Sequence, residues 1–212
     1  MVLNTRNANA KFLARDGLGH VTLNDGNARI HEAHRRRATW QDSVMPLHLV
    51  LVSDTHVPHR ARDLPAQVWA AVESADVVLH AGDWVTAELL DQFERRSRRL
   101  IGVYGNNDGP ELRRRLPETV AVTLDGVQFA MVHETGPARG RSERAESHYP
   151  DADVLVFGHS HIPWDTTTPR GLRLLNPGSP TDRRRQPVCT YMTAVVDGGL
   201  LQQVELVEVR KD

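Results

Sequence analysis

Cysteine and lysine are nearly absent from the sequence. Cys189 is the only cysteine among 212 residues, which excludes an intramolecular disulfide framework and a cluster of thiolate metal ligands. Lys11 and Lys211 are the only lysines, so almost all basic charge is carried by arginine. No apolar run approaches the length of a membrane span, and no signal-peptide core follows the first residue. We therefore expect a cytoplasmic protein that does not bind membranes.

A large net charge of either sign is also missing. The 26 Lys and Arg residues nearly balance the 27 Asp and Glu residues, which leaves a net charge of -1. This balance argues against nucleic acid as a partner, although it permits a local basic patch. Hydrophobic residues make up 40% of the chain and charged residues 25%, as in a soluble globular domain with a sizeable core.

The first 44 residues differ from the rest of the chain. They contain a basic cluster at residues 35–37 and few long apolar runs. A hairpin is predicted across residues 21–30, where Asn24-Asp25-Gly26 separates two short apolar segments, but two strands alone are marginally stable. We predict that residues 1–44 are an N-terminal extension, either flexible or the product of a mis-assigned start, and dispensable for catalysis. The catalytic domain is then residues 45–212, because Met45 directly precedes the first core strand.

From residue 47 onward, apolar runs and helical patterns alternate. Nearly continuous apolar runs predict strands at residues 47–52, 76–80 and 100–104, buried on both faces. Helices are predicted over residues 64–74, 86–96 and 111–116, and Thr86 is the expected N-cap of the second. Residues 136–148 are interpreted as a solvated helix or a loop. Further strands are predicted at residues 119–124, 127–132, 154–157, 164–168, 172–175, 190–196 and 201–209. This order favours an α/β fold with two packed sheets and helices outside them.

Seven side chains of metal-binding type follow the predicted strands. They are Asp54, His56, Asp83, Asn106, His133, His159 and His161. The carboxyl ends of strands in α/β sheets open into one crevice, so these side chains are expected to meet there. Carboxylate, amide and imidazole groups suit manganese, zinc, iron or nickel. Seven ligands are too many for one tetrahedral ion and fit two ions that share a carboxylate.

These residues lie in motifs that resemble those of the calcineurin-like metallophosphoesterases. The motifs are Asp54-Thr55-His56, Gly82-Asp83, Gly105-Asn106-Asn107-Asp108, His133 and Gly158-His159-Ser160-His161. Asn176-Pro177-Gly178-Ser179 is similar to a motif of the small YfcE-like branch, which shares its fold with a retromer subunit. The resemblance covers about residues 47–209. It implies a four-layer α/β/β/α sandwich of two mixed sheets flanked by helices.

The resemblance also implies a set of ligands for each of two divalent ions. Manganese is expected, with nickel, zinc or iron as alternatives. Asp54, His56 and His161 would hold the first ion, Asn106, His133 and His159 the second, and Asp83 would bridge them. The implied reaction is phosphodiester hydrolysis, with monoesters as a second class, in which a hydroxide shared by two ions about 3.5–4 Å apart attacks phosphorus. The predicted catalytic residues are Asp83, Asn106, Asn107 and Asp108.

Two positions depart from the family pattern. Asn107 stands where many relatives have histidine and the YfcE-like branch often has cysteine. An amide cannot act as a practical general acid, so we expect slow turnover or a preference for good leaving groups. Glu134 follows His133 where the family usually has glycine, and it is expected to alter ligand geometry or restrict the pocket.

The substrate is expected to be a small phosphorylated molecule. Asn107 and Arg183 are the predicted contacts, although residues 183–185 also fit an exposed charge run. His80 is interpreted as a core residue or a support for the ligands, and His48 as a core residue. The alternative function is a weakly catalytic or non-catalytic scaffold of the same fold that binds proteins, and a nuclease is a third hypothesis. Relatives often form dimers or tetramers, so a homo-oligomer is a further hypothesis, and the sequence leaves the oligomeric state open.

Overall fold

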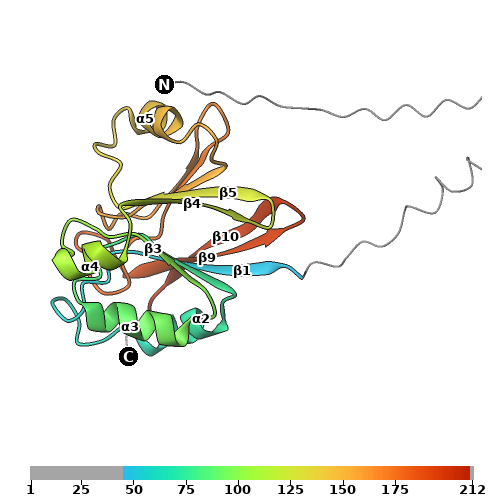
Figure 1. Cartoon of the computed structure of the whole chain (residues 1–212). Helices are drawn as coiled ribbons and strands as arrows, with labels where there is room; N and C mark the ends of the chain where they lie inside the picture. Colours follow the sequence, from blue (N-terminus) through green and yellow to red (C-terminus); the bar gives the residue numbers. More distant parts are fainter. Residues whose placement is uncertain (1–44, 211–212) are drawn as a thin grey trace, which may run out of the picture. The chain divides into compact units, whose positions relative to one another are not determined.

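Ten strands in two five-stranded sheets form the centre of the computed structural model (Figure 1). The structure describes residues 45–210. The predicted extension, with its hairpin at residues 21–30 and its predicted dispensability, therefore lies outside the described residues.

The first sheet has the strand order β10-β9-β1-β2-β3. Its strands are β1 (Leu47–Val52), β2 (Val77–His80), β3 (Leu100–Gly102), β9 (Thr190–Asp197) and β10 (Leu200–Glu208). The first three are parallel, because α2 (Ala66–Ser74) and α3 (Ala87–Arg96) connect them as crossovers. Strand β9 pairs with β1 in the antiparallel direction, which makes the sheet mixed. As predicted, Thr86 caps α3 by accepting a hydrogen bond from the Leu89 nitrogen.

The second sheet has the strand order β4-β5-β6-β8-β7. Its strands are β4 (Thr119–Leu124), β5 (Val127–Val132), β6 (Val154–Val156), β7 (Trp164–Thr167) and β8 (Arg173–Asn176). The central three are parallel, and the two edge strands are antiparallel to them. The predicted hairpin of β4 and β5 is confirmed, since Asp125 (φ 42°) and Gly126 (φ 83°) both have the left-handed backbone of a tight hairpin turn.

Three hydrophobic clusters separate four layers. The first contains Leu51, Leu79, Phe129 and Val156 and lies between the two sheets. The second packs Trp69 and Phe93 of α2 and α3 against the first sheet, and the third packs α5 (Arg141–His148) against the second. Figure 1 shows α2 and α3 on one outer side and α5 on the other. The predicted four-layer sandwich of two mixed sheets is therefore confirmed. A short helix, α4 (Pro110–Arg115), follows β3.

One core prediction is wrong. His48 has an exposed side chain, and its Nδ1 lies 3.5 Å from Asp76 Oδ2. The reason is that only the last four residues of β1 are buried, so its start lies at the margin of the covered sheet. In residues 45–210, no helix is long and apolar enough to cross a membrane.

Candidate metal centre

The seven predicted ligands lie on the loops that follow five strands, at one edge of the two sheets. Five of these residues have a left-handed backbone, at φ angles of 54° for Asp54, 45° for His56, 61° for Asp83, 69° for His159 and 58° for His161. Residues other than glycine rarely adopt this conformation, and such outliers concentrate at functional sites. The loops therefore adopt an unfavourable backbone conformation that directs polar side chains inward.

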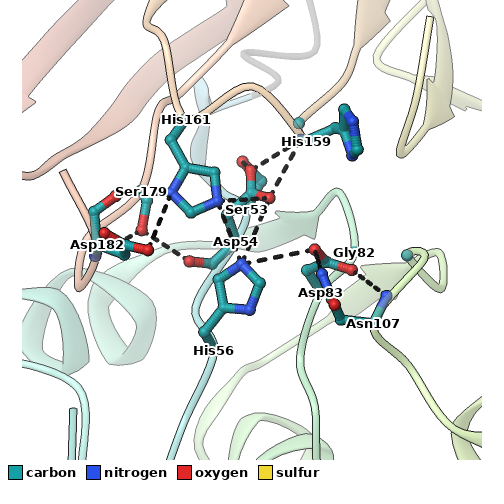
Figure 2. A network of polar contacts seen from close by, with 12 residues as sticks. Ser53, Asp54, His56, Gly82, Asp83, Asn107, His159, His161, Ser179 and Asp182 are labelled. Atoms are coloured by element: carbon teal, nitrogen blue, oxygen red, sulfur yellow. Dashed lines mark hydrogen bonds and ion pairs between the residues drawn. The ribbon is translucent and has the colours of Figure 1, made fainter. Parts of the chain in front are cut away.

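Asp54, His56 and His161 form a buried group in which the three polar ends face one another (Figure 2). The two Nε2 atoms of His56 and His161 are 3.2 Å apart. Asp54 Oδ1 lies 3.4 Å from His161 Nε2 and 3.9 Å from His56 Nε2. These are the three residues predicted to hold the first ion.

A second group surrounds the side chain of Asn106. Its Oδ1 lies 3.0 Å from His133 Nε2 and 2.9 Å from His159 Nδ1. Asp83 lies between the two groups, because its Oδ2 is 3.5 Å from His56 Nε2 and 3.4 Å from His133 Nε2. Asp54, Asp83 and His133 also form a buried cluster of their own. The structure therefore brings all seven predicted ligands into one continuous centre.

The donor atoms fit divalent metal ions in both spacing and chemistry. Ligands about 2.0–2.1 Å from a tetrahedral ion lie about 3.3–3.4 Å from one another, close to the separations in both groups. The oxygen and nitrogen donors are also the types that manganese, zinc, iron and nickel accept.

The tautomers of two histidines also suit metal binding. The Nδ1 of His133 lies 2.7 Å from the Ala81 carbonyl, and the Nδ1 of His161 lies 2.6 Å from the Asp182 carbonyl. A carbonyl oxygen can only accept, so each Nδ1 carries a hydrogen and each neutral ring directs the Nε2 lone pair into the site.

The comparisons with known proteins agree with this geometry. Residues 47–199 match the model of the calcineurin-like phosphoesterase superfamily domain. The chain belongs to this superfamily. This chain is 32% identical over 138 residues to a probable metallophosphoesterase of Methanothermobacter thermautotrophicus, and the match covers 62% of this chain and 76% of the relative. It is 25% identical over 162 residues to a phosphodiesterase of Methanocaldococcus jannaschii, covering 71% and 90%. Membership supports phosphoesterase activity in general and the binding of divalent metals.

Solved structures show the same fold. A Thermotoga maritima protein is 31% identical, with a TM-score of 0.63 over 76% of this chain and 99% of that chain. A zinc complex of Vps29 from Entamoeba histolytica has a TM-score of 0.62 at 22% identity, over 77% of this chain and all of that chain. At this identity, the likeness to Vps29 shows the fold alone.

The Asn-Pro-Gly-Ser motif of this chain, at residues 176–179, joins the ligand loops to one another. Asn176 Nδ2 donates to the Gly158 carbonyl at 2.8 Å, and Ser179 Oγ donates to the Asp54 carbonyl at 2.7 Å. Thr181 Oγ1 donates to the Thr55 carbonyl at 2.6 Å. These bonds satisfy buried backbone carbonyls and hold the loops after β1 and β6 together. The motif could be recognised in the sequence, but these hydrogen bonds could not be predicted from it.

His80 is buried and supports the same loops, in agreement with its interpretation as a core residue or a support for the ligands. Its ring is fully buried and stacks on Trp84, with the ring centroids 3.4 Å apart. Its Nδ1 accepts a hydrogen bond from the Gly82 nitrogen, so its Nε2 carries the hydrogen and donates to Thr55 Oγ1 at 3.1 Å. His80 therefore connects the loops that carry Asp54 and Asp83 without facing the ligands.

Asn107 and Asp108, both predicted to be catalytic, contact the Asp83 loop. Asn107 donates from its backbone nitrogen to Asp83 Oδ1 at 2.9 Å and from Nδ2 to Oδ2 at 2.6 Å. The buried carboxylate of Asp108 accepts hydrogen bonds from the backbone nitrogens of Asp83, Val85 and Gly105. Through these contacts Asn107 and Asp108 hold the Asp83 loop, and their predicted catalytic roles stay predictions, as does the substrate contact of the exposed Asn107.

Arg183, predicted together with Asn107 as a substrate contact, bonds within its own loop. Its Nη1 donates to the Gln186 carbonyl at 2.7 Å. The neighbouring Arg184 points toward the centre instead, because its Nη1 lies 3.4 Å from the His159 carbonyl. Arg184 has a left-handed backbone, with φ 46°, and its nitrogen donates to Asp182 Oδ1. The turn that Asp182 forms therefore brings Arg184, the second arginine of the run, to the site. The sequence alone could not show which arginine of the run would reach it.

Burial and charge set the protonation of the ligands. Burial raises the pKa of Asp54 to about 7 and lowers the pKa of His161 to about 4. Burial by itself lowers the pKa of His133, but a hydrogen bond with Asp83 and the charges of Asp54 and Asp83 raise it to about 8. Burial also opposes the charge of Asp83, yet hydrogen bonds with His133 and Asn107 hold the pKa of Asp83 below its usual range.

These pKa values predict that metal binding releases protons. At pH 6.5, the metal-free site holds protons on Asp54 and His133, and coordination requires both groups to lose them. Isothermal titration calorimetry with Mn²⁺, in buffers of different ionisation enthalpy, should show between about one and two protons released at pH 6.5 and few at pH 9. The affinity should increase with pH across this window. An affinity independent of pH would contradict the assignment of these two side chains as ligands.

Proposed function

We propose that the protein hydrolyses phosphodiesters, with monoesters as a second class, at a centre of two divalent ions. The observation that carries this proposal is the position of Asp83, whose Oδ2 lies within 3.5 Å of a histidine nitrogen in each ligand group. Asp54, His56 and His161 would hold one ion, Asn106, His133 and His159 the other, and Asp83 both.

The two ions would supply Lewis acidity, which activates water and neutralises the charge of the phosphoryl group. Manganese is our first choice for this donor set, with nickel, zinc or iron as alternatives. The protein supplies position and charge. Asn107 fixes both oxygens of Asp83, and its amide has no proton to give to a leaving alcohol. We therefore expect turnover to favour good leaving groups, such as aryl alcohols.

Arg184 is the residue that we assign to the phosphoryl oxygens in place of Arg183. Within residues 45–210 its guanidinium makes one hydrogen bond, at 3.4 Å, so most of its donors remain for an anionic substrate. Its positive charge also reaches the first ligand group, because after burial it is among the influences that lower the pKa of His56 and His161. Arg60 lies near His56, whose pKa its charge helps to lower after burial, and its Nε is 3.3 Å from Asp182 Oδ2.

The variant Arg184→Ala should lower kcat/KM about 10- to 100-fold, as expected for the loss of a hydrogen bond to a charged group. The matched variant Arg183→Ala should stay within about twofold of the parent protein. The affinity for Mn²⁺ should not decrease in Arg184→Ala, because a cation near the ligands opposes metal binding. Steady-state kinetics at saturating Mn²⁺ checks the first two results. Equal losses in both variants would contradict the distinction between the two arginines.

The central experiment is hydrolysis of bis(p-nitrophenyl) phosphate with Mn²⁺, Ni²⁺, Zn²⁺ and Mg²⁺ in turn, with Asp83→Asn as the inactive control. Turnover that depends on the metal and on Asp83 would support the proposal. The absence of turnover with all four metals would favour the alternative, a protein-binding scaffold of the same fold. A small phosphorylated substrate, membership of the YfcE-like branch, a cytoplasmic location and homo-oligomerisation stay predictions.

A further inference from the structure

A small cavity of about 180 Å³ adjoins the second ligand group. Asn106 and His133 belong both to that group and to the cavity wall, and the rest of the wall includes Tyr104, Arg113, Glu118 and Glu134. A substrate whose phosphorus lies at the metal centre can therefore extend one substituent into this space. The cavity is smaller than the roughly 300–1,000 Å³ of common ligand pockets, which favours a small substituent.

Two carboxylates give this cavity a negative wall. Glu134, which stands where the family usually has glycine, has a half-exposed side chain whose Oε1 lies 3.8 Å from His159 Nε2. Glu118 Oε2 accepts a hydrogen bond from the Tyr104 hydroxyl at 3.0 Å. Both carboxylates keep oxygens that can accept hydrogen bonds from a hydroxyl or an ammonium group.

The cation in the same wall is committed to the protein. Arg113 donates to the carbonyls of Asp108 at 2.8 Å, Gly105 at 3.1 Å and Asn106 at 3.3 Å. Its guanidinium also stacks on Tyr104, 4.5 Å from the ring centroid. These three hydrogen bonds end on main-chain carbonyls and support the loop of Asn106, and Arg113 also interacts with the Tyr104 hydroxyl.

A second cavity of about 310 Å³ shares Glu134 and Val132 with the first. Its arginine is committed in the same way, since Arg144 donates to the carbonyls of Thr135, Pro137 and Arg139. Glu134 thus stands in the wall between two spaces whose arginines bind main-chain carbonyls. The less committed guanidinium of Arg184 lies beside the His159 carbonyl and lines neither of these two cavities. Glu118 and Glu134 therefore outnumber the one arginine in the wall of the first cavity.

We propose that this cavity binds the substituent that remains on phosphorus, and that Glu134 and Glu118 select a small neutral or cationic alcohol there. The inference rests on the proposed function and deepens it. A monoester has a second charged oxygen in place of that substituent, and near neutral pH it carries up to two negative charges. The carboxylates repel this second charge, whereas a hydroxylated or amine-bearing group gains hydrogen bonds or ionic attraction. Charge in the cavity wall thus makes the centre selective for diesters.

Three substrates that release the same p-nitrophenol test this proposal. They are p-nitrophenyl phosphorylcholine with a cationic substituent, bis(p-nitrophenyl) phosphate with a neutral one, and p-nitrophenyl phosphate with a charged oxygen. In Glu134→Gln, kcat/KM should increase about 10-fold for the monoester and decrease about 10-fold for the choline diester, and the change for the neutral diester should lie between these two. Glu118→Gln should change the three values in the same directions. The control Glu205→Gln, on exposed strand β10, should change none.

Binding of inorganic phosphate to the Mn²⁺-loaded protein gives a second measurement that does not depend on turnover. Calorimetry should show tighter phosphate binding in Glu134→Gln by about 10-fold and no change in Glu205→Gln. Equal effects of Glu134→Gln on all three substrates, or unchanged phosphate affinity, would overturn the inference while the proposed function stands. If the parent protein hydrolyses none of the three substrates with any metal, the proposed function fails and the selectivity fails with it.

Discussion

The variant Asp83→Asn should lose at least ~10³-fold in kcat/KM and bind less metal than the parent protein. The reason is that one oxygen, Asp83 Oδ2, lies 3.5 Å from His56 Nε2 and 3.4 Å from His133 Nε2, so one substitution affects both ligand groups. Loss of a partner that only supports a ligand already costs about 10–100-fold in metal affinity or activity, and Asp83 itself contacts both groups. The substitution also removes an acceptor of the Asn107 amide.

Two measurements check this result together. Hydrolysis of bis(p-nitrophenyl) phosphate at saturating Mn²⁺ gives the activity, and elemental analysis after dialysis gives the number of ions retained. The control Asp151→Asn replaces an exposed aspartate before β6 and should change neither. An Asp83→Asn protein with near-normal activity and full metal content would refute the bridging role.

The fold followed from local patterns that the tertiary structure does not override. Continuous apolar runs marked β1 and β2, and the Asp125-Gly126 pair marked the β4–β5 hairpin because its turn needs two left-handed residues. His48 was misplaced because a strand pattern shows which residues alternate but not where the covering layer ends. The exposure of the start of β1 depends on which elements pack beside it. Those elements are distant in sequence, so a local pattern does not reveal them.

The meeting of the seven candidate ligands could be predicted because each one lies in a loop that follows a strand, where an α/β fold collects polar side chains. Their supports could not be predicted in the same way. Ser179 donates to the Asp54 carbonyl across 125 positions, and Thr181 donates to the Thr55 carbonyl across 126. The choice between Arg183 and Arg184 depends on one left-handed residue beside Asp182. Such contacts arise only when distant loops meet, so motif spacing carries no signal for them.

The variant Gly105→Ala should displace the carboxylate of Asp83 although it leaves all seven ligands in place. A Cβ at Gly105 would lie 2.5 Å from the Asp83 nitrogen and closer still to Asp83 Oδ1. These atoms belong to a buried loop that Asp108 and Asn107 hold by hydrogen bonds, so the overlap cannot be relieved by a side-chain rotation alone. We expect a loss of about 1–3 kcal/mol in the free energy of unfolding, typical of overpacking, and a loss of about 10–100-fold in Mn²⁺ affinity.

Gly109→Ala is the matched control, because a Cβ at Gly109 would meet no atom within 4 Å and its φ is -73°. It lies in the same segment, at the start of α4, and should retain the parent's metal affinity within about twofold, since an open site adds no overlap. Urea unfolding of the metal-free proteins separates the loss of stability from the loss of binding, which calorimetry measures below the unfolding transition. If Gly105→Ala bound Mn²⁺ as tightly as Gly109→Ala, close approach of the two loops would not be what positions Asp83, and the hydrogen bonds from Asn107 would have to position it instead.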